Sequence, residues 1–390
     1  MLLALLLACV QPSDTPAQPA VADLLVPEYQ RTMSELFLLD SGRHDMDDIL
    51  GGITAALPGY TQINFITNAG TRPEFLRDRT HRIVPDSLPR TLRDSPQFWA
   101  QDVFQVISRA DGTRTLVLPK GEQFQPEAAT VLGELGYDTR TSQLVWEGGN
   151  ISGDVVGGQS VLYIGYTIYE GQSERAENPG VPLEDVQRTL AEEFEVDEVV
   201  PVPYVSASLF HLDQIFLITA PGEVVVHSLS LDGSEAMIRD YTREQDNYFY
   251  KVYVDSLGPE VPPAAHAEGY LDSLPRLQAY ASQHALKMQT RLDEVAALFD
   301  QRGYTVHRLE ADPRQFWDRL SLVNGVPYVD RETGEKVLLL PEYTNHKRAS
   351  FADMHRAKEL FESLDYTVRF VPVLTGSGGG GPHCLSNVGW

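Results

Sequence analysis

The chain of 390 residues contains only two cysteines, Cys9 and Cys384. So few cysteines exclude a small fold that is held together by a network of disulfides. The sequence also lacks a run of about 18 consecutive apolar residues, so it predicts no membrane-spanning helix. Positive charge is scarce, since 31 Lys and Arg stand against 55 Asp and Glu and leave a net charge of −24. That balance argues against a nucleic-acid-binding protein and favours cationic ligands, although excess negative charge can also serve solubility alone.

The first residues carry a possible export signal. Residues 1–8 are almost entirely Leu and Ala, and Leu6-Leu7-Ala8-Cys9 resembles the lipobox of bacterial lipoproteins. The resemblance implies that residues 1–9 are a signal segment and that Cys9 becomes lipidated. We expect the Pro-rich residues 10–27 to be a flexible tether. The protein is then exported, either anchored to a membrane or free in the periplasm or outside the cell. An apolar start without any export function is the alternative.

A unit of apolar strand, amphipathic helix and apolar strand recurs five times. The predicted ranges are 35–39, 47–57 and 62–66; 115–119, 127–135 and 142–146; 161–164, 183–194 and 198–205; 215–218, a helix ending near 299, and 304–306; and 336–341, 351–364 and 366–373. The pattern predicts an α/β fold in which residues 28–390 form one domain, with 222–275 as an irregular insertion. Five copies favour a closed ring of modules with helices outside, and ordinary α/β alternation is the alternative.

Unusual polar residues follow the second strand of each module. These segments are Phe98–Asp102, Trp146–Asn150, Phe210–Asp213, Asp312–Asn324 and Gly376–Cys384. In a ring of modules they converge on the axis, so one Cys, one His and three carboxylates are expected to meet there. His211 and Asp213 are two residues apart and face the same side if the segment is extended. His383 would then face away from Cys384, and we interpret it as structural.

The order of these motifs resembles the guanidino-group-modifying enzyme superfamily, which includes arginine deiminases, agmatine deiminases, peptidylarginine deiminases and amidinotransferases. Its pattern is an aromatic-x-x-Asp, then Glu-Gly-Gly, then His-x-Asp, then a Gly-rich stretch before a C-terminal Cys. All four parts occur here in that order, between residues 98 and 384. The resemblance implies a pseudo-symmetric five-bladed α/β propeller, the pentein fold. It also implies that the site residues are Asp102, Glu147, His211, Asp213 and Cys384.

The chemistry of a guanidino group agrees with that set. Its carbon is resonance-stabilised and needs a strong nucleophile, which a Cys384 thiolate can supply. Asp102 and Asp213 can each accept a pair of N–H bonds from a planar guanidinium. His211 can protonate the departing ammonia and then activate water against a thiouronium intermediate, while Glu147 orients the imidazole. The predicted enzyme is a Cys-dependent deiminase that converts a guanidino group to a ureido group and ammonia.

Other functions stay open at this point. An amidinotransferase uses the same Cys and His chemistry, and a non-catalytic lipoprotein could merely bind a cationic ligand. His211-x-Asp213 could be a metal pair, but we expect no metal and no cofactor, because no zinc-type spacing is found. The glycines of 376–381 match a dinucleotide motif without the helix that it requires.

The segment Ile164–Glu170 indicates which guanidine is used. Arginine deiminases have an arginine in the equivalent stretch, which binds the α-carboxylate of free arginine, whereas no Arg occurs here before Arg175. We therefore expect a peptidyl-arginine or agmatine-like substrate.

Overall fold

The structure is a computed structural model. It describes residues 24–25, 27–39, 44–67, 74–85, 104–108, 113–121, 127–170, 177–232, 234–244, 247–257, 263–343, 351–373 and 381–389. Four predicted features lie largely or wholly outside these ranges: the signal segment 1–9, most of the tether 10–27, the motif Phe98–Asp102, and the glycines of 376–380. Among the described helices, none is both long enough and apolar enough to cross a membrane.

The described strands form five small sheets, so the chain has an α/β fold with several sheets. The strands are β1 Leu24–Leu25, β2 Glu35–Leu39, β3 Gln62–Thr67, β4 His81–Pro85, β5 Gln105–Ser108, β6 Arg114–Leu118, β7 Asp138–Thr141, β8 Ile151–Val156, β9 Gln159–Ile164, β10 Glu198–Pro201, β11 Phe216–Ala220, β12 Glu223–Leu229, β13 Thr305–Ala311, β14 Val326–Val329, β15 Lys336–Glu342, β16 Thr367–Pro372 and β17 Ser386–Gly389. We number the sheets 1 (β17-β2-β3-β4), 2 (β1-β5-β6-β7), 3 (β10-β9-β8), 4 (β11-β12-β13) and 5 (β14-β15-β16).

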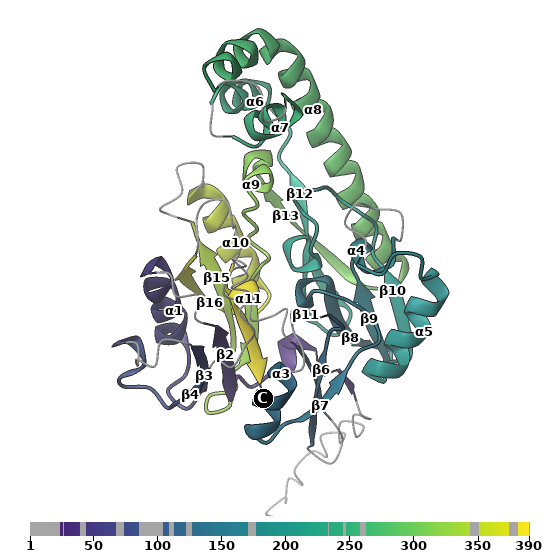
Figure 1. The fold of residues 1–390 in the computed structure, drawn as a ribbon, viewed down its shortest axis with the longest axis vertical. Helices are drawn as coiled ribbons and strands as arrows, with labels where there is room; N and C mark the ends of the chain where they lie inside the picture. The colour runs from purple at the N-terminus through teal and green to yellow at the C-terminus, as the bar shows by residue number, and fades with distance from the viewer. Residues whose placement is uncertain are drawn as a thin grey trace, which may run out of the picture.

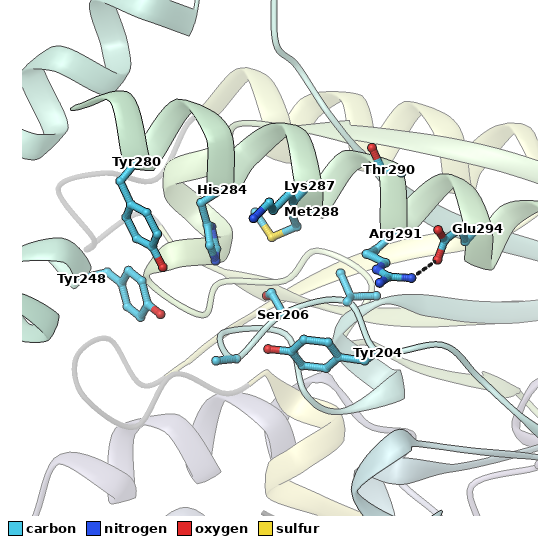
Figure 2. A pocket seen from close by; sticks show the side chains of 12 residues that line it. Tyr204, Ser206, Tyr248, Tyr280, His284, Lys287, Met288, Thr290, Arg291 and Glu294 are labelled. Atoms are coloured by element: carbon cyan, nitrogen blue, oxygen red, sulfur yellow. Dashed lines mark hydrogen bonds and ion pairs between the residues drawn. The ribbon is translucent and has the colours of Figure 1, made fainter. Parts of the chain in front are cut away.

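Helices connect the strands and cover the sheets (Figure 1). The α-helices are α1 His44–Ala56, α3 Glu127–Glu134, α4 Tyr166–Tyr169, α5 Leu183–Phe194, α6 Ser234–Arg243, α7 Tyr248–Leu257, α8 Pro263–Gln301, α9 Pro313–Trp317, α10 Phe351–Ser363 and α11 Pro382–Leu385, and the short 3-10 helices are η1 Glu28–Gln30, η2 Glu74–Leu76, η4 Gly148–Asn150 and η5 Leu212–Gln214. The long helix α8 extends beyond the sheets, and its middle part borders a cavity (Figure 2).

The predicted strand-helix-strand repeat is present in all five sheets. Each sheet contains a parallel pair whose two strands are joined through a helix: β2 and β3, β6 and β7, β9 and β10, β12 and β13, and β15 and β16. An antiparallel strand flanks each pair, namely β17, β5, β8, β11 and β14. The first strand of each pair is therefore bonded on both edges and lies in the interior of its sheet.

The hydrophobic core is divided into clusters that each join two sheets. Successive residues of a strand point to opposite faces, so one strand can serve two clusters. Leu36 lies in a cluster with residues of sheet 5, whereas the next residue, Phe37, lies in a cluster with residues of sheet 2. Each cluster contains buried residues from two sheets. Examples, one for each cluster, are Leu36 with Leu339, Phe37 with Leu116, Val117 with Leu162, Tyr163 with Val226, and Val225 with Leu338. Burial on both faces explains why these strands are continuous apolar runs.

Three predicted strand positions were wrong. The second strand of module 2 is β7 and not 142–146, because β7 consists of polar residues at a solvent-exposed edge while Leu144 and Trp146 pack into the core from a loop. The second strand of module 3 ends at Pro201 and not at Val205. In module 4 the residues predicted as the leading strand lie mostly in β11, which is antiparallel, and the parallel strand is β12.

The segment 222–275 was predicted to be irregular and is instead largely regular. It contains β12, α6, α7 and the first turns of α8. Gly222 at φ +68° forms the tight turn between β11 and β12, a conformation that glycine adopts without strain. The prediction failed because two apolar strands follow each other across this turn, and only the first was recognised.

Candidate functional site

Each described polar motif precedes the antiparallel strand of a sheet. Glu147 lies before β8, His211 and Asp213 before β11, Asn324 before β14, and Cys384 before β17. The repeat therefore places these four motifs at equivalent points of four modules, as the sequence predicts. Asp102, from the motif that precedes β5, lies outside the described residues.

The thiol of Cys384 is held between two side chains from other modules. Its Sγ lies 3.2 Å from Asp213 Oδ2, to which it donates, and accepts a bond from Asn324 Nδ2 at 3.1 Å. The backbone N–H of Cys384 also donates to Asn324 Oδ1, at 3.4 Å. Cys384 is 6% exposed and forms no disulfide. The predicted nucleophile is thus buried, reduced and oriented.

A glycine makes the approach of Asn324 possible. A Cβ placed on Gly381 would lie 2.4 Å from the backbone oxygen of Asn324 and 2.5 Å from its Oδ1. Any other residue at position 381 would push Asn324 away from the thiol. The last glycine of the Gly-rich stretch therefore allows close packing at the Cys384 thiol.

His211 and Glu147 form the second part of the site. His211 Nε2 is hydrogen-bonded to Glu147 Oε2, so the predicted pair is in contact. The side chain of Glu147 is 37% exposed, whereas that of His211 is 10% exposed, so the pair reaches from the interior to the surface. A Cβ placed on Gly149 would lie 2.6 Å from His211 Nδ1 and 3.2 Å from Asp213 Oδ2. The Glu-Gly-Gly motif therefore supplies both a carboxylate and the space for the His-x-Asp motif.

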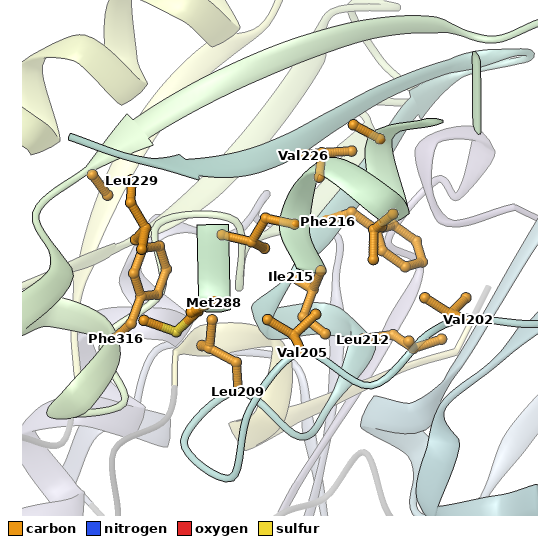
Figure 3. Close-up of a cluster of buried hydrophobic side chains, with 14 of the residues drawn as sticks. Val202, Val205, Leu209, Leu212, Ile215, Phe216, Val226, Leu229, Met288 and Phe316 are labelled. Carbon is orange, nitrogen blue, oxygen red and sulfur yellow. The ribbon is translucent and has the colours of Figure 1, made fainter. Parts of the chain in front are cut away.

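The segment around His211 is anchored by apolar side chains on both sides. Val202, Val205 and Leu209 precede it, Leu212, Ile215 and Phe216 follow it, and each is at most 5% exposed (Figure 3). The segment is not extended as predicted, because His211 caps the 3-10 helix η5, which contains Asp213. Both side chains nevertheless face the same side, since His211 and Asp213 both lie close to Gly149.

His383 does not face away from the thiol of Cys384. Because residues 382–385 form α11 and not an extended strand, His383 and Cys384 both reach Asp213 Oδ2, the former through Nδ1 at 3.0 Å. The other ring nitrogen, Nε2, lies 2.7 Å from Glu28 Oε1, and Arg31 Nη1 lies 3.6 Å from the same oxygen. With a carboxylate at each nitrogen, the ring is held as an imidazolium that donates twice.

The pKa values follow from this arrangement. Burial by itself lowers the pKa of His383, but the carboxylates of Glu28 and Asp213 outweigh it and raise the pKa to about 10. Burial by itself raises the pKa of Glu28, but the charge of His383, and then that of Arg31, lowers it to about 2. The contacts that run from Arg31 through Glu28 and His383 to Asp213 thus link η1, near the described N-terminus, to the thiol of Cys384.

A Glu28→Gln variant should lose stability mainly near pH 6. The charge of His383 stabilises the fold fully below its ordinary pKa of about 6.5, and this contribution is lost as the pH rises towards 10. The charge of Glu28 contributes above about pH 4.5 and is lost as the pH falls towards 2. Removing one partner of a buried ion pair costs about 3 kcal/mol. Urea unfolding at pH 6 should show this loss, and at pH 10 a smaller one.

The exposed Glu74, which pairs with Arg77 on the surface, gives the matched control. Glu74→Gln should change the free energy of unfolding by less than about 1 kcal/mol at either pH. Equal stability of Glu28→Gln and wild type at pH 6 would show that the buried pair does not stabilise the fold.

The sequence reasoning missed three residues that the structure brings to the thiol or to its carboxylate partner: Asn324, His383 and Glu28. Asn324 was part of the fourth polar segment but was not singled out, although its position at the end of that segment matches that of the other motifs. His383 was assigned the wrong direction. No feature of the sequence marked Glu28 as a site residue, because it lies outside the repeated motifs.

Within the described ranges, no group of three or more His, Cys, Asp or Glu residues is arranged so that it could hold a metal ion. Asp213 and His383 also border an internal cavity of about 10 Å³, which is room for about one water molecule.

Solved structures of two agmatine deiminases are similar to this chain over most of its length. The agmatine deiminase of C. jejuni matches with a TM-score of 0.60 at 12% sequence identity, over 93% of this chain and 94% of that one. The agmatine deiminase of Enterococcus faecalis matches with a TM-score of 0.58 at 16% identity, over 94% and 95%. This chain has the agmatine deiminase fold. The predicted resemblance to the guanidino-group-modifying superfamily is therefore confirmed at the level of the fold.

The likeness is structural and not one of sequence. No family model and no curated protein sequence matches the chain. A variant of the C. jejuni agmatine deiminase with substrate bound also matches, with a TM-score of 0.59 at 11% identity over 93% of this chain and 95% of that one. At these identities, what the chain does has to be argued from its own site residues.

Proposed function

We propose that this protein is a Cys-dependent deiminase that hydrolyses a guanidino group to a ureido group and ammonia. The observation that carries the proposal is the contact of the Cys384 thiol with the Asp213 carboxylate, beside the His211–Glu147 pair. A carboxylate this close to a thiol disfavours the thiolate unless cations compensate. The His383 imidazolium, bonded to the same Asp213 oxygen, is one such cation. A bound guanidinium would be a second, and it brings its own electrophilic carbon to the sulfur.

The proposed reaction has two stages. The Cys384 thiol gives its proton to Asp213 as Sγ attacks the guanidinium carbon and forms a C–S bond. The tetrahedral adduct then expels ammonia, which takes a proton from the His211 imidazolium, and leaves a thiouronium on the sulfur. Water attacks the same carbon and gives a proton to His211; the C–S bond breaks, the sulfur takes its proton back from Asp213, and the hydroxyl proton passes to solvent as the ureido product leaves. Glu147 stabilises the imidazolium state of His211 through their hydrogen bond. Asn324 Nδ2 donates to the sulfur and keeps it in position.

Asp213 is proposed to bind the substrate as well. Its Oδ2 accepts from Cys384 and His383, while its buried Oδ1 has no hydrogen-bond partner among the described residues. A buried acceptor without a partner is costly, and an N–H group of a guanidinium would satisfy it. We propose Asp102 as the second carboxylate of this clamp, from the motif alone.

Replacing Asp213 by Asn should weaken substrate binding at least tenfold. The change keeps the shape of the side chain but removes a charge-assisted bond, which contributes about 1.5–3 kcal/mol. Affinity is measured by calorimetry in a Cys384→Ser background, so that turnover does not interfere. Asp102→Asn should have a similar effect, whereas Asp330→Asn, in a surface turn, should have none. Unchanged affinity in both test variants would contradict the clamp.

The substrate is proposed to be a peptide-borne arginine or agmatine. Residues 166–169 form the short helix α4, in which Tyr166 is 7% exposed and contacts Tyr204 edge to face, with ring centroids 4.4 Å apart. Glu170 follows, and it would repel the α-carboxylate of free arginine. Steady-state kinetics should give a kcat/KM for peptidyl-arginine or agmatine at least tenfold above that for free L-arginine. Free L-arginine as the best substrate would reject this specificity, without rejecting a deiminase.

We also propose that the five sheets are the blades of a closed propeller. Four of the five core clusters join two sheets that follow one another along the chain, and the remaining cluster joins sheet 5 to sheet 1. Sheet 1 also pairs the C-terminal β17 with β2. Such a ring would place the five proposed site residues around one axis: Asp102, Glu147, His211, Asp213 and Cys384. Export with lipidation of Cys9 is likewise a proposal, and it rests on residues 6–9 alone.

A further inference from the structure

A second cavity lies away from the proposed catalytic residues. It has a volume of about 560 Å³, within the range of cavities that bind small molecules. Its walls are the loop Tyr204–Ala207, Tyr248 at the start of α7, and one face of α8 from Tyr280 to Glu294 (Figure 2). The lining includes none of Glu147, His211, Asp213 and Cys384.

The floor of this cavity is apolar and its sides are aromatic. Val205 and Met288 are 5% and 1% exposed and belong to the core cluster between sheets 3 and 4. Tyr204 and Tyr280 are 38% and 48% exposed, although both are large aromatic side chains. In Figure 2 the rings of Tyr248 and Tyr280 and the imidazole of His284 lie close to one another at one end of the cavity. A planar apolar group would fit among these rings and bury their faces.

His284 offers a hydrogen-bond donor to the cavity. Trp317 Nε1 donates to His284 Nδ1 at 3.1 Å, so Nδ1 is the acceptor of the ring and the hydrogen is on Nε2. Burial, and then the nearby charge of Lys287, lower the pKa of His284, which keeps the ring neutral at pH 7. A neutral ring with a fixed tautomer can donate from Nε2 to an acceptor in the cavity.

The rim carries excess positive charge, in contrast to the chain as a whole. Lys287 and Arg291 lie one turn apart on the same face of α8, and the only acidic lining residue is Glu294. Arg291 Nη1 is paired with Glu294 Oε2 at 2.6 Å, whereas Lys287 has no acidic partner among the described residues. The rim of the cavity therefore has a net positive charge, although the chain as a whole has a net charge of −24. This rim would repel a cationic ligand, whereas an anionic ligand would neutralise the charge of Lys287.

We propose that this cavity binds a small organic carboxylate with a planar apolar body. The body lies on Val205 and Met288 between the tyrosine rings, and the carboxylate accepts from Lys287 Nζ and His284 Nε2. The loop Tyr204–Ala207 continues to His211, so the ligand contacts the segment that positions the proposed general acid and base. The proposal does not depend on deiminase activity, because it concerns binding alone.

Calorimetric titration with N-acetyl-L-phenylalanine tests this proposal, and two relatives of the probe test the role of its charge. The neutral N-acetyl-L-phenylalaninamide should bind at least tenfold more weakly than the acid, and the cationic phenethylamine should not bind measurably. Lys287→Glu, at an exposed position, should weaken binding of the acid at least tenfold. Lys358→Glu, an exposed lysine on α10, is the matched control and should leave it unchanged.

Four results would overturn the proposal. Equal affinity for the acid and the amide would mean that the carboxylate is not recognised, and preferred binding of the amine would mean that the tyrosines form a cage for cations. The absence of binding of any probe up to about 10 mM would show that the cavity has no such ligand. Full affinity of Lys287→Glu would place the bound acid elsewhere on the protein. None of these results bears on whether Cys384 is a nucleophile.

Discussion

Replacing Cys384 by alanine should lower the rate of guanidine hydrolysis by about four orders of magnitude or more. The proposed reaction has no other nucleophile, and removing a member of a catalytic group that acts as a unit typically costs that much. The loss should appear in kcat, measured as ammonia released per enzyme per unit time. Cys384 is buried and contacts Asn324 and Asp213, so the smaller alanine should be accommodated and the protein should stay folded.

The second cysteine of the chain provides the control. Cys9→Ala should keep full activity in a purified, soluble preparation, because residue 9 belongs to the predicted signal segment. A Cys384→Ala variant that retained even one-tenth of the wild-type rate would mean that no covalent bond to this sulfur is needed.

Replacing His211 by alanine should reduce kcat by about three orders of magnitude. Two proton transfers are assigned to this ring, and a positioned acid or base contributes about 10²–10⁴ in rate. Glu147→Gln should have a smaller effect, because it can still hydrogen-bond to the imidazole while losing the charge that stabilises its protonated form. The pH profile of kcat separates the two roles: Glu147→Gln should shift the limb that reports His211 towards lower pH, since the imidazolium is less stable.

His355, an exposed residue of α10 that is paired with Glu359, is the matched control. His355→Ala should retain the wild-type kcat. If His211→Ala lost less than about tenfold, another group would have to move the protons, and the role assigned to the His211–Glu147 pair would be incorrect.

Much of the modular fold could be predicted because its interior strands are buried on both faces. Runs such as 161–164 and 336–341 have few polar residues, and each is followed by a helix and a second strand, as the structure confirms. Strands at exposed edges do not have this signature: β7 reads Asp-Thr-Arg-Thr and was missed. The β11–β12 hairpin was missed for a different reason. Two apolar runs lie on either side of Gly222, and only the first of them was recognised as a strand.

The candidate site could be predicted where chemistry is repeated at equivalent points of the modules. Glu147, His211, Asp213 and Cys384 were found in this way, and the structure brings them into direct or shared contact. Residues that act through tertiary contacts alone were not found. Glu28 and His383 are in contact although they are 355 residues apart in the sequence, and no local sequence pattern predicts such a pair. The direction in which the His383 side chain points depends on whether its segment is helical or extended. The segment has only four residues, which are too few to predict a helix from the sequence.

The central claim is that the guanidino carbon is hydrolysed by way of Cys384. Its most direct test is to count both products when the wild-type protein acts on agmatine and on a peptide-borne arginine. A hydrolase releases one ammonia for each ureido group formed, with no added amine required. We predict this one-to-one ratio for the wild type and neither product for Cys384→Ala. Transfer of the amidino group to an added amine without a ureido product, or tight binding of the guanidines with no turnover at all, would contradict the account.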